Sequence, residues 1–113
     1  MTQIFRSAFD REFSVIQDEL VTMSRLVDQA IERAMQALIE RDVVLAEQVI
    51  ADDSEVNRLR YKIEEDCITL IATQQPAAGD LRAVVAAMHM VVEMERMGDH
   101  AAGIAKTVIL MSD

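Results

Sequence analysis

Apolar residues recur every three or four positions in three long segments of this chain, beginning near Phe5, Leu45 and Leu81. This spacing is that of one face of an α-helix, and charged residues fill the intervening positions as a solvated face requires. Each segment is therefore predicted to be one amphipathic helix. The predicted helices cover roughly residues 3–40, 43–73 and 80–111.

Polar breaks separate the three segments. In the break at 40–42, Asp42 is predicted to cap the second helix by accepting a hydrogen bond from a free backbone N–H. Pro76 cannot continue a helix, so the second helix should end near Thr73, and Asp80 is the expected cap of the third. Three helices with short links form an all-α, antiparallel up-down-up bundle. Such long helices leave large side surfaces available to another bundle.

Composition agrees with one helical domain over residues 1–113. The chain is 51% hydrophobic with only 3 Gly and 1 Pro, which excludes a disordered segment and a turn-rich β-sandwich. A net charge of −9 disfavours nucleic acid as a partner. A lone cysteine, Cys67, suggests a reducing compartment such as the cytoplasm. We expect no secretory signal and no membrane insertion, because no apolar run approaches the ~20 residues of a span.

One carboxylate interrupts the apolar stripe of the third helix. Steps of three or four residues lead from Val92 to Glu95 and then to Asp99, which lies one turn further on the same face. A carboxylate among apolar positions tends to pair with a cation or to bind a metal, and oxygen ligands suit hard ions such as Ca, Mg, Mn or Fe. The alternative is structural: Arg96, or an arginine from another helix, pairs with Glu95.

The sequence has two further acidic pairs near its apolar stripes. Asp28 and Glu32 repeat the four-residue spacing on the first helix. Asp52 and Asp53 interrupt the second stripe, so that one of them should face inward or the helix should bend there. A capping or hinge role is the simpler interpretation of that pair, because an Asp side chain readily forms hydrogen bonds with the nearby backbone.

Catalytic signatures are missing from the sequence. It has no Ser or Cys nucleophile beside a His, no Gly-rich phosphate loop and no paired Glu-x-x-His repeat of a di-iron bundle. His89 and His100 are about three helical turns apart, too far to share one metal ion directly. Cys67 lies on the second stripe and is expected to act as a small hydrophobe. We therefore predict that the protein is not an enzyme.

Three stretches of the chain are distinctive: EMERMGDHAAGIA at 93–105, QQPAAGDLR at 74–82 and DSEVN at 53–57. They resemble segments of the PhoU family of phosphate-signalling regulators. The resemblance covers essentially the whole chain and implies one three-helix repeat, whereas the family carries two in tandem. We expect either the N-terminal half of a longer protein, which the uncapped apolar run at 108–111 favours, or a single repeat whose homodimer imitates the tandem.

The resemblance also implies a function. It suggests a cytoplasmic, non-enzymatic negative regulator that couples the ATPase component of the high-affinity phosphate ABC transporter to a sensor histidine kinase. The family binds metal clusters through a Glu or Asp followed four residues later by Asp. Glu95 and Asp99 match that form, and Asp28 and Glu32 match it loosely because Glu replaces the final Asp. Gly98 is expected to let a neighbouring helix approach closely.

Two other functions are compatible with the sequence. One is a carboxylate-based metal-binding or metal-buffering bundle, which would hold Fe, Mn, Mg or Zn. The other is a purely structural helical spacer. Under the spacer hypothesis, neutralising Glu95 and Asp99 would leave every partner interaction intact.

Overall fold

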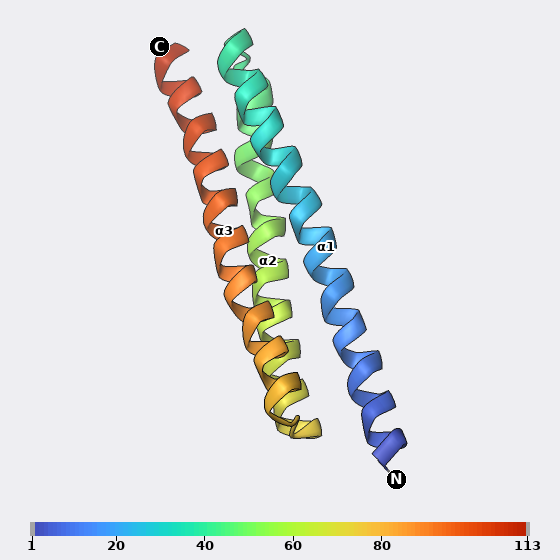
Figure 1. The fold of residues 1–113 in the computed structure, drawn as a ribbon. Coiled ribbons are helices and arrows are strands. Elements are labelled where there is room, and N and C mark those ends of the chain that lie inside the picture. Colours follow the sequence, from blue (N-terminus) through green and yellow to red (C-terminus); the bar gives the residue numbers. More distant parts are fainter. Residues whose placement is uncertain (1, 113) are drawn as a thin grey trace.

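The computed structural model describes residues 2–112, which form three helices and no strand. They are α1 (Thr2–Glu40), α2 (Val43–Gln74) and α3 (Ala78–Ser112). The helices lie side by side in a rod with Cα extents of 64 × 17 × 15 Å, and α2 runs antiparallel to α1 and α3 (Figure 1). The predicted all-α three-helix bundle is confirmed. Side chains are described for residues 8–112, so the predicted stripe residue Phe5 lies outside them.

The start of α3 differs from the prediction. The helix begins at Ala78, so Asp80 lies inside its first turn and is not its cap. The backbone N–H of Leu81 already donates to the Ala77 carbonyl at 2.8 Å, which places the first turn directly after Pro76. Proline is well tolerated just before a helix, where a backbone N–H is not needed. Asp80 still favours the helix, because a carboxylate in the first turn interacts well with the helix dipole.

The link between α1 and α2 uses Arg41 where glycine is usual. Arg41 adopts a left-handed backbone with φ of 55°, and the N–H of Asp42 donates back to the Ala37 carbonyl at 2.9 Å. This reversal ends α1 without a glycine. The Asp42 side chain then accepts a hydrogen bond from the N–H of Leu45 at 3.1 Å, which confirms the predicted cap of α2.

The end of α2 has the same left-handed backbone conformation as the end of α1. Gln75 has φ of 43°, and its N–H donates to the Ile71 carbonyl at 3.1 Å. Because left-handed backbone costs an L-residue roughly 1–2 kcal/mol and glycine little, we expect Gln75→Gly to stabilise the protein by about 1 kcal/mol in urea unfolding. Gln74→Gly is the matched control. It should destabilise by about 1 kcal/mol, since Gln74 is the last residue of α2. Equal effects at both positions would contradict this explanation.

The core has two parts along the rod. In the longer part, large side chains such as Ile16, Met23, Ile63 and Val91 are almost completely buried. The part near the α1–α2 link is built mainly from alanines, including Ala34, which let helices pack at short separations. Within the described residues, no helix carries an apolar stretch long enough to cross a membrane.

Candidate functional site

Glu95 lies at the boundary between α2 and α3, where its side chain is only 15% exposed. Arg60 reaches across from α2 and places Nη1 2.5 Å from Glu95 Oε2, while its Nε donates to Glu64 Oε1 at 2.9 Å. The hydrogen bond to Glu95 is the main cause that raises the pKa of Arg60, followed by the one to Glu64. An arginine from another helix therefore compensates the carboxylate that interrupts the apolar stripe.

Arg96, the other predicted partner of Glu95, pairs within its own helix. Arg96 Nη1 lies 3.1 Å from Glu93 Oε1 on the same helix, and both side chains are well exposed. An exposed pair at this spacing contributes little to stability. The pair at the α2–α3 boundary is thus the stronger structural element of the two.

Asp53 adds a third carboxylate beside Glu95 and Asp99. Its side chain is half-buried and its pKa is raised, first by burial and then by the charges of Asp99 and Glu95, with Lys106 opposing the rise. Asp52, its neighbour, is exposed and is held by Arg33 of α1 at 2.7 Å. α2 continues unbroken through both residues, so Asp53 is the inward-facing member of the pair and no hinge forms.

Gly98 permits this close approach of α2 and α3. A Cβ built on Gly98 would lie 3.2 Å from Val56 Cγ1 and 3.3 Å from Asp53 Oδ1. Both distances are shorter than ordinary van der Waals contact. The predicted packing role of Gly98 is confirmed, and the same close approach brings Asp53 to the edge occupied by Glu95 and Asp99.

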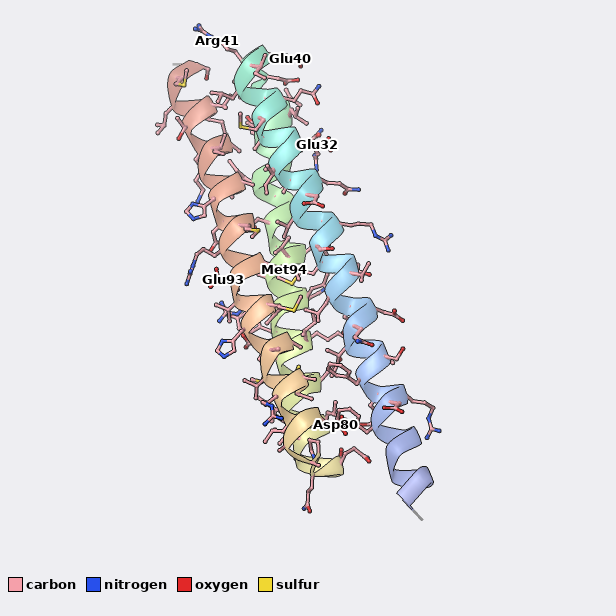
Figure 2. The ribbon with its side chains drawn as sticks, viewed as in Figure 1. Glu32, Glu40, Arg41, Asp80, Glu93 and Met94 are labelled. Carbon is pink, nitrogen blue, oxygen red and sulfur yellow. The ribbon has the colours of Figure 1, made fainter. Side chains whose placement is uncertain are left out.

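The structure does not gather the four predicted metal ligands. Glu95 and Asp99 belong to the α2–α3 edge, whereas Asp28 and Glu32 are exposed on α1. Figure 2 shows Glu32 on the side of α1 that faces away from α3. Across the described part of the chain, no three His, Cys, Asp or Glu residues are arranged to hold one ion. These residues do not form a complete metal site, and the site stays a prediction.

A second carboxylate cluster lies between α1 and α2 and was not predicted. Lys62 Nζ lies 3.1 Å from Glu19 Oε2 and 3.0 Å from Asp66 Oδ2. Burial, followed by the Asp66 side chain, raises the pKa of Glu19. Burial also acts to raise the pKa of Asp66, but Glu19 and Lys62 outweigh it and lower that pKa. The sequence held one signal: Glu19 lies three residues after Ile16, at stripe spacing.

Glu19 should make stability depend on pH. Its raised pKa means that the folded state keeps the proton at a pH where the unfolded state has lost it. That contribution to stability is present below the unfolded pKa and is lost as the pH rises through the folded pKa. We expect Glu19→Gln to stabilise the protein at pH 7 by about 1 kcal/mol, with a smaller gain at pH 4, measured by urea unfolding at both values.

Glu65→Gln is the control for this change, because Glu65 is exposed on α2. It should leave stability at either pH nearly unchanged. A gain from Glu19→Gln that is the same at pH 4 and pH 7 would contradict the role given to the raised pKa of Glu19.

The cysteine and the two histidines belong to neither carboxylate cluster. Cys67 is buried, and burial raises the pKa of its thiol to about 11, so the thiol is protonated at neutral pH. His89 and His100 are exposed on α3. The predicted role of Cys67 as a small hydrophobe agrees with this position.

Residues 20–108 match the PhoU domain. The chain belongs to the PhoU family. The match includes the Arg60–Glu95 pair, Asp53 and Gly98, so the α2–α3 edge lies within the part of the chain that the PhoU domain covers.

Two PhoU relatives are similar over most of this chain. "Phosphate-specific transport system accessory protein PhoU homolog 2" of Mycobacterium tuberculosis is 45% identical over 89% of this chain and 47% of its own length. The Aquifex aeolicus accessory protein PhoU homolog is 40% identical over 91% of this chain and 47% of its own length. The chain thus spans about half the length of these relatives.

Solved PhoU structures share the fold. The crystal structure of PhoU from Pseudomonas aeruginosa aligns with a TM-score of 0.89 at 35% identity, covering 91% of this chain and 49% of that one. The phosphate transport system regulatory protein PhoU from Streptococcus pneumoniae aligns with a TM-score of 0.84 at 37% identity, covering 89% and 48%. The long three-helix bundle is therefore an architecture found in PhoU proteins.

Proposed function

We propose that the chain is a cytoplasmic, non-enzymatic adaptor that represses phosphate-starvation signalling. It would couple the ATPase component of a phosphate ABC transporter to a sensor histidine kinase. The observation that carries the proposal is membership of the PhoU family, in which relatives similar over about nine-tenths of this chain are named accessory proteins of the phosphate-specific transport system.

The α2–α3 edge supports a docking role. The Arg60–Glu95 pair joins α2 to α3, while the exposed Asp99 and the half-buried Asp53 extend the negative charge toward solvent. A rigid acidic edge suits a basic surface on a partner, because complementary charge guides association and selects among partners. In this proposal, transport status determines which partner is bound, and the resulting population shift carries the signal.

Co-elution tests the adaptor role. The tagged protein is mixed with the purified transporter ATPase and, separately, with the cytoplasmic part of the kinase. We expect both to be retained, and Asp53→Asn/Asp99→Asn to weaken retention by about tenfold. Asp18→Asn/Glu47→Gln is the control with the same loss of charge at exposed positions elsewhere. If neither partner is retained by the unaltered protein, the adaptor proposal is wrong.

Metal buffering is a second candidate, and the raised pKa of Asp53 is the observation that favours it, since a cation would relieve the repulsion of Asp99 and Glu95. Against it, Arg60 already holds Glu95. We therefore assign no step of the adaptor mechanism to a metal. Elemental analysis of the purified protein separates the two roles: buffering requires several ions per chain that are lost in Asp53→Asn/Asp99→Asn.

A further inference from the structure

The carboxylate of Glu19 lies in the boundary between α1 and α2 without a hydrogen-bond donor. Its side chain is 13% exposed, both oxygens are shielded from solvent, and neither accepts a hydrogen bond from any described residue. Lys62 Nζ lies 3.1 Å from Glu19 Oε2, but the hydrogen bond of this ammonium goes to Asp66 Oδ2 at 3.0 Å. An ionised carboxylate in this position is costly, because no hydrogen bond offsets its lost hydration.

The charges around Glu19 do not supply the missing donor. On α2, Arg58 acts on Glu19 through its charge alone, and its Nε donates to Glu55 at 3.1 Å. On α1, Glu12 lines a cavity of about 270 Å³ that Asp66 also borders, and it adds another negative charge. Among the described residues, neither helix therefore donates a hydrogen bond to Glu19.

The other neighbours of this boundary carry no charge at neutral pH. Cys67 of α2 is a thiol whose pKa is raised to about 11, first by burial and then by the charge of Asp66. The third helix contributes apolar side chains to the core cluster that contains Cys67: Val84, Ala87 and Val91. A proton on Glu19 would turn this unsatisfied acceptor into a donor, and Asp66 is the acceptor next to it.

We propose that Glu19 and Asp66 share one proton, and that this proton latches α1 to α2. Their side chains interact directly, and both lie against the Lys62 ammonium. In the latched state, the protonated carboxyl of Glu19 donates to Asp66, which also accepts the hydrogen bond from Lys62. The three groups are then neutral together, with one negative charge on Asp66 and one positive charge on Lys62. The raised pKa of Glu19, caused first by burial and then by the Asp66 side chain, agrees with this position of the proton.

Loss of the proton reverses this balance. The proton passes to solvent, and two carboxylates then share one ammonium beside an apolar core. Their repulsion and the hydration of Glu19 both favour an open state, in which the N-terminal half of α1 moves away from α2. The Arg33–Asp52 pair holds the other half of α1 to α2, and Figure 1 shows the N-terminal end of α1 extending past the α2–α3 link. The opening is therefore local, and it uncovers the buried Ile16.

Hydrogen–deuterium exchange tests the latch on the protein alone. Rates are measured by mass spectrometry at about pH 5 and about pH 8, and they are corrected for the effect of pH on intrinsic exchange. We expect residues 9–23 to exchange about fivefold faster at the higher pH, the factor that one net hydrogen bond contributes. The increase should depend little on added urea, which distinguishes local opening from unfolding of the whole bundle.

Two variants and a control identify the proton. Glu19→Gln keeps a donor toward Asp66 at every pH, so its corrected exchange should be the same at the two pH values. Asp66→Asn offers an amide donor to the ionised Glu19 and should also remove the increase. Glu65→Gln removes one charge at an exposed position of α2 and should keep the increase.

The contrary results are equally specific. Equal exchange of residues 9–23 at both pH values in the unaltered protein overturns the proposal, as does a pH effect that persists in either variant. An increase that depends on urea to the same extent in all three helices also overturns it, because that pattern is global unfolding. No transporter or kinase enters these measurements, so the latch and the adaptor role are tested separately.

Discussion

Arg60→Ala is expected to destabilise the bundle by about 2 kcal/mol, because it removes hydrogen bonds between a guanidinium and two partly buried carboxylates. Arg60 contacts both Glu64 and Glu95, whose side chains are 26% and 15% exposed. Urea unfolding followed by circular dichroism measures the loss.

Arg58 supplies the control for this prediction. Its side chain is 59% exposed and pairs with Glu55 on its own helix, so Arg58→Ala should leave stability nearly unchanged. Arg60→Met/Glu95→Met should recover most of the stability lost in Arg60→Ala, since apolar residues of similar volume often replace a buried pair without loss. Equal destabilisation by Arg58→Ala and Arg60→Ala would show that the α2–α3 pair has no special role.

Gly98→Leu should destabilise the protein by about 2 kcal/mol, as a larger side chain in a closely packed position typically does. The side chain would collide with Val56 and with the Asp53 carboxylate, which already lie 3.2 and 3.3 Å from the position of a Cβ. The loss remains after the gain of about 1 kcal/mol that a helix makes when glycine is replaced. The mid-point of urea unfolding and the thermal unfolding temperature should both fall.

Gly103 is the matched control on the same helix. No heavy atom lies within 4 Å of a Cβ built there, and the residue is exposed. Gly103→Leu should therefore stabilise the protein by up to about 1 kcal/mol through helix propensity alone. Stabilisation by leucine at both positions would mean that α2 and α3 do not meet closely at Gly98.

The sequence predicted the helices well because helix formation depends on neighbours three or four residues away. Asp42 and Pro76 acted as expected, since a cap and a missing N–H are local effects. Asp80 was misassigned because α3 begins two residues earlier, at Ala78, directly after the non-helical Ala77. Residues 78 and 79 thus belong to α3.

The candidate site was predicted in part. The position of Glu95 on an apolar stripe indicated that a partner compensates its charge. That partner is Arg60, which lies 35 positions earlier in the chain. No local pattern identifies Arg60, because many charged residues of α2 occupy similar positions. Glu19 escaped notice for a related reason: the stripe runs through its neighbour Leu20, which is buried, so the pattern looks complete without it.

By itself, the sequence determined three long helices, their approximate ends, the family resemblance and one carboxylate at an apolar position. Only the tertiary structure decided that Arg60 holds Glu95, that Asp53 joins Asp99, and that Lys62 lies between Glu19 and Asp66. The reason is that local spacing determines how a helix forms, whereas the rotation and register of packed helices are set by the whole core, including the close approach at Gly98.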